Sequence, residues 1–332
     1  MKKTLVLLGA AVFLLMACNK SETVVNEAQR EISFKAVTNT PTKADPEHPG
    51  GALDGTYVMY VAASTESQKK YIQSQLFKYD SEAEAPKWRA WSTTADNFAA
   101  VYWPSGTQEV DFLAIAGPSG MPVPTFNTTS NERATKDVTV GSASYDTYTN
   151  QNDIMYAVRN SVANNTSPVT LNFQHAHALL EFKAKKETAE NVTIHGITIN
   201  GMQYLGSFNV DNAKTTLIPA WNLDATTANK AVYKVNDSTT NDLNFAITSS
   251  EATKCAMHLL VPEQSSKSMT ITYDIGSTTG VTYELSIPRQ MWKMGYIYTY
   301  VLDFNATGEI TFTATVANWE TGTVTPSLPS IG

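Results

Sequence analysis

The sequence predicts an all-β protein, and three observations lead to that prediction. Short segments rich in Val, Ile, Thr, Tyr and Phe recur at intervals of about ten residues along the chain. Gly, Pro, Asn and Ser separate these segments, as is typical of turns. Patterns with a helical period are nearly absent, and a short helix is expected only at Ser67–Leu76. Many short strands joined by turns favour β-sandwiches or barrels.

Residues 1–17 have the organisation of a secretory signal peptide. Lys2 and Lys3 precede a short apolar run that ends at Ala17. The run is shorter than the roughly 20 apolar residues that cross a bilayer. It closes with Leu-Met-Ala-Cys, which looks like a bacterial lipobox, so cleavage is expected between Ala17 and Cys18, with a lipid on the Cys18 thiol. A buried cysteine in an uncleaved signal anchor is the alternative.

Lipidation would make the mature chain membrane-anchored rather than membrane-spanning. One acyl chain binds a bilayer only marginally, whereas two or more hold stably, so a diacylglycerol on Cys18 is expected to anchor the chain in the outer membrane. The polar residues 18–29 are expected to form a lipidated tether. Their start, Asn19 to Glu22, resembles with imperfect spacing the signal that sends lipoproteins of Bacteroidetes to the cell surface.

Charge and cysteine content limit the partners and the fold. Loss of Lys2 and Lys3 changes the formal charge from −7 to −9, which argues against nucleic acid or an anionic membrane surface as a partner. Cys255 is the one other cysteine, so no intrachain disulfide is expected to hold the fold. A mature chain of roughly 315 residues suits two domains, each with its own apolar core.

The first strand is expected at Arg30–Val37, where Ile32, Phe34 and Ala36 alternate with polar residues. Residues 38–51 follow, rich in proline and glycine, and are expected to be unpaired chain. Residues 118–150 are poor in large apolar side chains and are expected to form a long loop. A charged run at 185–190 marks the expected break between an N-terminal sandwich (30–187) and a C-terminal sandwich (188–332).

Further strands are expected in both halves of the chain, each rich in β-branched or aromatic residues. They are Tyr57–Ala62, Phe77–Tyr79, Val101–Trp103, Val110–Ala116, Ile154–Val158, Val169–Phe173, Leu179–Ala184, Val192–Ile199, Leu243–Thr248, Cys255–Val261, Met269–Tyr273, Val281–Ile287, Ile297–Phe304 and Ile310–Val316.

The sequence offers little that indicates catalysis. No nucleophile elbow, Walker loop or dinucleotide fingerprint occurs. His175 and His177 have the spacing that places both on one strand face, as in half of a metal site, but a packing role is favoured. Trp88, Trp91 and Trp103 either form a sugar-stacking platform or, the favoured interpretation, belong to a core. We therefore expect no catalytic residue, no cofactor and no bound metal.

Seven short segments occur in a fixed order over most of the mature chain. They are Val101-Tyr102-Trp103-Pro104, Asp111-Phe112-Leu113-Ala114, Asp153-Ile154-Met155-Tyr156-Ala157, Leu171–Phe182, Leu259-Leu260-Val261-Pro262-Glu263, Trp292–Tyr300, and Ile310-Thr311-Phe312 with Val316-Ala317-Asn318-Trp319. Together they resemble the fimbrillin family of Bacteroidales, the Mfa-like subunits of type V pili.

The resemblance implies two tandem transthyretin-like β-sandwich domains and a lipoprotein precursor that reaches the cell surface. It also implies that a trypsin-like protease cuts after a basic residue behind the first strand. A strand of the next fimbrial subunit then fills the groove. A non-polymerising surface lipoprotein that binds host or bacterial surface glycans, or another host ligand, is the alternative.

Processing is expected between Lys43 and Ala44. Arg30 and Lys35 lie in the strand, whereas Lys43 lies beyond it among prolines, in the kind of exposed loop where nicking concentrates. Many family members carry an arginine at this place, and an ordinary solvated lysine is the alternative. The donor is expected in residues 309–332, although Ile310–Val316 could belong to the second domain's own sheet. Because Pro326 and Pro329 weaken the rest as a strand, stalk, tip and anchor roles stay open.

Overall fold

A computed structural model describes most of the chain downstream of the predicted tether. The described residues are 30–38, 53, 55–68, 70–85, 87–127, 137–144, 153–164, 168–203, 205–213, 216–223, 232–234, 244–254, 259–261, 263–265, 268–287, 291–307, 309–318 and 324–325. The regular elements among them are all β-strands, so the predicted all-β class is confirmed. The described part accordingly offers no helix with the length and apolarity needed to cross a bilayer.

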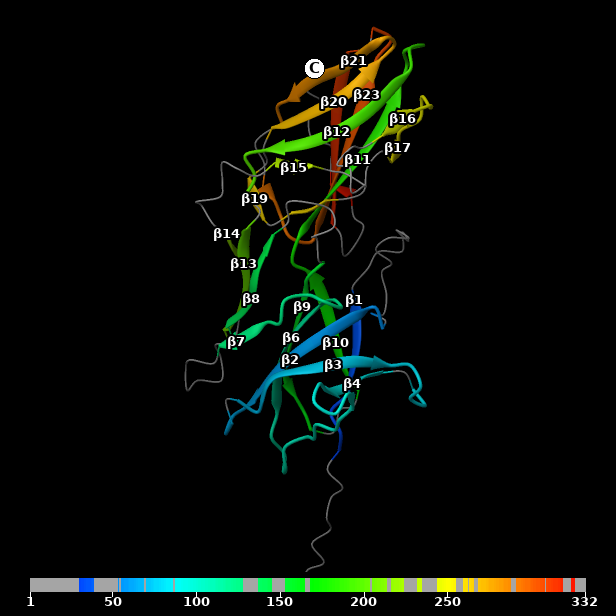
Figure 1. The fold of residues 1–332 in the computed structure, drawn as a ribbon. Helices are drawn as coiled ribbons and strands as arrows, with labels where there is room; N and C mark the ends of the chain where they lie inside the picture. The colour runs from blue at the N-terminus through cyan, green and yellow to red at the C-terminus, as the bar shows by residue number, and fades with distance from the viewer. Residues whose placement is uncertain are drawn as a thin grey trace, which may run out of the picture.

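The N-terminal half forms a sheet that closes on itself around a core (Figure 1). Its order is β1-β10-β9-β6-β2-β3-β4-β5, and β1 also pairs with β4. The strands are β1 (Phe34–Thr38), β2 (Tyr57–Thr65), β3 (Ile72–Asp80), β4 (Lys87–Ser92), β5 (Asn97–Phe98), β6 (Val110–Pro118), β9 (Met155–Val162) and β10 (Val169–His175). The helix expected at Ser67–Leu76 is wrong, because β3 begins at Ile72 and pairs with β2 and β4.

The C-terminal half is a sandwich of two sheets. One has the order β17-β11-β23-β24-β25, with β18 also on β11, and the other has the order β15-β12-β20-β21, with β16 also on β12. The strands of the first are β11 (Ala178–Lys186), β17 (Thr253–Lys254), β18 (Leu259–Val261), β23 (Tyr296–Phe304), β24 (Ile310–Asn318) and β25 (Val324–Thr325). Those of the second are β12 (Val192–Asn200), β15 (Val232–Lys234), β16 (Phe245–Ile247), β20 (Met269–Ile275) and β21 (Thr278–Leu285), and β19 (Gln264–Ser265) pairs separately with β22 (Met291–Trp292).

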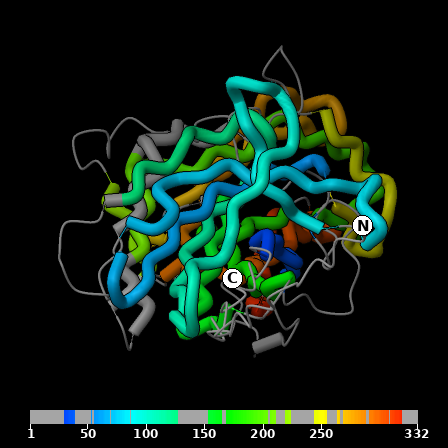
Figure 2. The backbone as a smooth tube through the Cα atoms, turned by 90° about the horizontal axis from the view of Figure 1, so that it is seen from below, coloured from blue at the N-terminus to red at the C-terminus, as the bar shows by residue number. Residues whose placement is uncertain are grey.

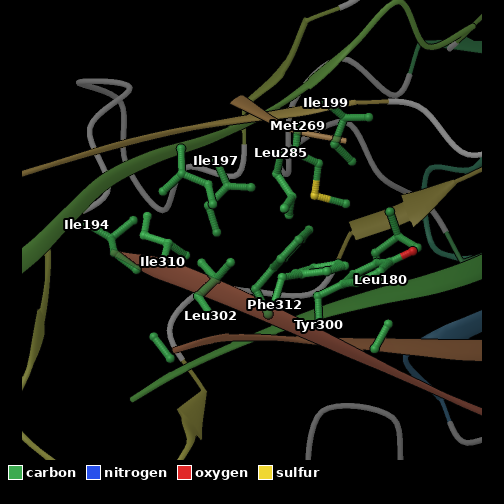
Figure 3. Packing of buried hydrophobic residues seen from close by; sticks show 14 of the residues in the cluster. Leu180, Ile194, Ile197, Ile199, Met269, Leu285, Tyr300, Leu302, Ile310 and Phe312 are labelled. Atoms are coloured by element: carbon green, nitrogen blue, oxygen red, sulfur yellow. The ribbon is translucent and has the colours of Figure 1, made fainter. Parts of the chain in front are cut away.

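Alternation along the strands of this sandwich builds its core. Alternate residues of β12 on either side of a bulge between Ile194 and Gly196, such as Ile197 and Ile199, point toward the opposite sheet. Tyr300 and Leu302 of β23 and Phe312 of β24 meet them there (Figure 3). Burial of each such side chain contributes about 1.5–3 kcal/mol. The apolar face of one sheet therefore covers that of the other, as expected for a β-sandwich.

A third sheet connects the two halves of the chain. Its order is β14-β13-β8-β7, and its strands are β7 (Thr125–Asn127), β8 (Asp137–Ser144), β13 (Leu205–Ala213) and β14 (Thr216–Leu223). The loop expected at 118–150 therefore contains two strands, because β13 supplies a distant pairing partner for β8. Phe208 and Val210 of β13 pack against Leu113 and Ile115 of β6. Seen from below, the cyan strands of the first half lie in front of the orange and red C-terminal strands (Figure 2).

β11 belongs to the C-terminal core although it precedes the expected domain break. It pairs in parallel with β23 from Leu179 to Lys186, and Leu180 and Phe182 are buried in the cluster of the second half. The boundary between residues 187 and 188 stays a prediction. The packing leads us to propose that the N-terminal unit instead ends near His177, between β10 and β11.

His177 is buried at this junction. Its ring centroid lies 4.9 Å from that of Trp221, and its carbonyl oxygen accepts a hydrogen bond from the backbone N–H of Gly295. Burial is the main cause that lowers the pKa of His177 to about 4; Asp153 opposes the shift, and nearby His175 adds to it. The junction therefore holds a neutral imidazole at neutral pH.

This depressed pKa makes the fold sensitive to acid. Between about pH 6.5 and pH 4 the unfolded chain binds a proton at His177 that the folded chain excludes, so the free energy of unfolding falls as the pH falls, by roughly 3 kcal/mol in total. We expect His177→Phe, which keeps a ring against Trp221, to remove this part of the pH dependence. Urea unfolding of both chains at pH 7, 5.5 and 4 measures how the free energy of unfolding changes with pH. The same pH dependence in the two chains would contradict the assignment to His177.

Candidate functional site

The first strand closes the N-terminal sheet, and the predicted strand at Arg30–Val37 is confirmed in position. β1 pairs in parallel with β10 from Phe34 to Thr38, and its Phe34 is paired with Trp88 of β4 on the other side. The segment before it is held too: the backbone N–H of Ile32 donates to Val101 O at 2.7 Å, and that of Trp103 donates to Arg30 O at 2.9 Å. The strand therefore has main-chain partners on both sides.

Three side chains of this segment enter the core. Ile32 and Phe34 are 0% exposed and Ala36 is 2% exposed. The Phe34 ring contacts two others edge to face, with centroids 4.9 Å from Phe77 and 5.2 Å from Phe112. Such pairs contribute about 0.5–1.5 kcal/mol beyond area burial. We call the space that these three side chains fill, bordered by β4 and β10, the β1 slot.

An ion pair holds the rim of the β1 slot. Arg89 of β4 donates from Nε to Glu31 Oε1 at 2.9 Å and from Nη1 to Asp80 Oδ2 at 3.0 Å. The hydrogen bonds to Glu31 and then Asp80 raise the pKa of Arg89. Asp80 is further fixed because its Oδ1 accepts the backbone N–H groups of Glu82 and Ala83. Arg89 thus presents a positioned guanidinium to a carboxylate on the first strand.

The segment that follows β1 includes the expected processing site. Lys43 and Ala44 lie outside the described residues, so cleavage between them stays a prediction. The chain returns to the strand at Leu53, which is buried and whose backbone N–H donates to Ala36 O at 3.2 Å. Arg30 and Lys35 have exposed side chains, but the main chain around them is paired, as the choice of Lys43 assumed.

The tryptophans are largely structural. Trp88 and Trp103 are buried in the N-terminal core, as the favoured interpretation predicted. Trp91 is half-buried, packs edge to face on Phe98 at 5.0 Å between centroids, and carries Lys78 Nζ over its ring at 3.8 Å. These three side chains therefore do not form one open stacking platform.

The two histidines make different contacts. His175 Nδ1 lies 3.0 Å from Asp153 Oδ1, whereas the ring of His177 packs against that of Trp221 at a tilt of 45°. Across the described part of the chain, no three His, Cys, Asp or Glu side chains gather in a way that could hold a metal ion. The packing role is therefore the one the contacts support. The lipidation and cleavage predictions at Ala17 and Cys18 lie outside the described residues, as does Cys255.

Sequence comparison places this fold in a family. The profile of the fimbrillin-like family matches residues 49–319. The chain belongs to the fimbrillin-like family. No curated protein matches the sequence. Membership supports a fimbrial or adhesin role, a location at the cell surface and a structural rather than catalytic function.

Solved structures agree with the fold of this fimbrillin-like chain. A proposed cell adhesion protein from Bacteroides uniformis superposes with a TM-score of 0.54 at 13% identity, covering 87% of this chain and 99% of its own. A second, from Bacteroides ovatus, gives 0.51 at 16% identity, with 88% and 98% covered. The matched profile begins at residue 49, so β1 precedes it.

Removing the ring that fills the β1 slot should destabilise the fold. We expect Phe34→Ala in the uncut chain to lower the free energy of unfolding by about 3–5 kcal/mol, because it leaves a cavity between Phe77 and Phe112. Lys35→Ala, at the neighbouring exposed position, is the matched control and should change it by less than about 0.5 kcal/mol. Urea denaturation measures both, and similar losses in the two variants would contradict the assigned burial.

Proposed function

We propose that the chain is a structural subunit or an accessory or tip adhesin of a type V fimbria. It is exported as a lipoprotein and is assembled by strand exchange after proteolysis removes its first strand. The observation that carries this proposal is the position of β1: the first described strand closes the sheet and fills the slot, and no strand precedes it among the described residues. Cutting behind it would separate one complete sheet strand from the rest of the subunit.

The interactions of β1 are strong enough to keep it bound in the uncut chain, and another strand could restore them after β1 is removed. Ladder hydrogen bonds contribute about 0.5–1.5 kcal/mol net each, and Ile32 and Phe34 contribute about 1.5–3 kcal/mol each on burial. The sum is roughly 5–10 kcal/mol before the cost of ordering the strand. A slot emptied of β1 would expose apolar surface and unpaired main-chain groups, which is the template that β-strand addition uses.

The donor strand is proposed within residues 309–332. In the precursor, Ile310–Asn318 forms β24 and pairs with β23 over its whole length, so it serves its own sandwich first. The buried Trp88 and Trp103 weigh against the alternative of a glycan platform built from the tryptophan cluster. Other fimbrial subunits are therefore the partners we propose.

Limited proteolysis tests the processing step. We expect mild trypsin to cut the folded mature chain, which starts at Asn19, first after Lys43. The main chain of β1 is paired on both sides, and this pairing protects the bonds after Arg30 and Lys35 from the protease. Mass spectrometry identifies the cut, and native electrophoresis over hours follows the appearance of oligomers. Lys43→Ala is the control and should stay uncut there. First cleavage at Arg30 or Lys35 would sink the proposed site.

Lipid anchoring is tested at Cys18. In cells of a Bacteroidetes host we expect the wild-type chain to partition with the outer membrane and to incorporate labelled fatty acid. Cys18→Ala should lose both, because the thiol carries the only proposed lipid. Label on the Cys18→Ala chain, or membrane partition unchanged by the substitution, would contradict the anchor.

A further inference from the structure

The chain contains a second copy of the sequence that fills the β1 slot. The first strand reads Glu31-Ile32-Ser33-Phe34-Lys35-Ala36, and the segment that begins β24 reads Glu309-Ile310-Thr311-Phe312-Thr313-Ala314. Four of the six positions are identical, and a fifth exchanges serine for threonine. The identical residues include all three that enter the slot and the acid that reaches its rim.

The two segments also share a burial pattern. Phe34 and Ala36 are buried with Lys35 exposed between them, and Phe312 and Ala314 are buried with Thr313 exposed between them. Ile32 and Ile310 are both buried ahead of these pairs. The segment that begins β24 could therefore present the same three kinds of side chain to the β1 slot, in the register that β1 itself has.

The ion pair at the rim of the β1 slot gives a reason why Glu309 occupies the position that matches Glu31. Arg89 contacts Glu31 and stays tied to Asp80 at 3.0 Å, which leaves its guanidinium in place when the first strand departs. Glu309 is exposed in the precursor. Among its described contacts, its carboxylate accepts a hydrogen bond only from half-buried Asn305, whose side-chain oxygen also accepts the backbone N–H of Glu309. The carboxylate of an incoming strand can therefore replace that of Glu31 once the bonds between Glu309 and Asn305 are broken.

We propose that the β1 slot accepts residues Glu309–Val316 from a second copy of this chain, in the register that puts Ile310, Phe312 and Ala314 in the places of Ile32, Phe34 and Ala36. Arg89 fixes that register through the Glu309 carboxylate. This inference rests on the proposed strand exchange and specifies its donor, partner and register. Thr311 in place of buried Ser33 adds one methyl group, which the slot must accommodate.

The donor can leave its own sheet from one side. β24 pairs with β23 along nine positions, but β25 pairs with it at only Val316 and Ala317. Most of its outer edge is thus unpaired by the described strands. Leaving costs the nine-position pairing with β23 and the contact of Phe312 with Tyr300, whose ring centroids are 5.2 Å apart. Entry into the slot offers the five-position pairing with β10 and the rings of Phe77 and Phe112 instead.

Disulfide trapping between two copies tests the register. β1 pairs Lys35 with Thr170 of β10, so Thr313 of the donor should lie opposite Thr170 of the acceptor. One mature chain carries Thr170→Cys and an inserted site for a specific protease after Lys43, and a second, distinguishable chain carries Thr313→Cys. Both positions are exposed. Neighbouring strands lie about 4.8 Å apart, within disulfide reach.

After the cut we expect the mixed chains to form a covalent heterodimer. Its yield should be at least about fivefold higher than with the control Thr315→Cys, whose thiol is displaced along the strand by two residues, or roughly 7 Å. Glu309→Gln should slow its formation roughly three- to tenfold, and Arg89→Gln should abolish that difference. Each chain alone controls for Cys255. Assembly without this cross-link would overturn the assigned donor and register, whereas absence of any assembly after cutting would overturn both this inference and the proposed strand exchange.

Discussion

The N-terminal core depends on the pairing of one short strand from the beginning of the described chain. β1 touches both β10 and β4, so it turns an open sheet into a closed one. Its contacts are all distant in sequence: Phe34 meets Phe77, Trp88 and Phe112. Each of these contacts joins β1 to another strand of the sheet, so the burial of β1 depends on the rest of the sheet. A strand that borders the core on both sides and can be cut from the rest of the chain is the physical requirement for exchange.

The same dependence explains which features the sequence could predict. Alternation is local, so the strands around Ile32, Ile197 and Phe312 follow from residue order alone, and the family segments imply the sandwich class. The pairing of β8 with β13 depends on a hairpin far along the chain, and residues 137–144 by themselves look like a polar loop. β11 resembled the last strand of the first unit because a charged run follows it, yet its apolar face serves the second core.

The rim of the slot was missed for a related reason. Glu31 and Arg89 are 58 positions apart, and each alone looks like a solvated surface charge. Only the closed sheet brings them to 2.9 Å and adds Asp80. The repeated hexapeptide was visible in the sequence, but it acquires meaning only once burial shows that its four identical residues are the ones that fill the slot and reach Arg89.

Two similar strands for one slot raise the question of what would keep an uncut precursor from exchanging strands. While β1 is covalently attached, it competes for the slot at an effective concentration in the millimolar range, set by the short linker. A strand from another copy, present at far lower concentration and held in its own sheet by β23, cannot displace it. A cut behind β1 removes that advantage without changing a single contact, because the freed strand then dilutes when it dissociates. Proteolysis would thus control assembly through entropy, and near-identical side chains in donor and departing strand would let the slot regain the side-chain contacts that it loses with β1.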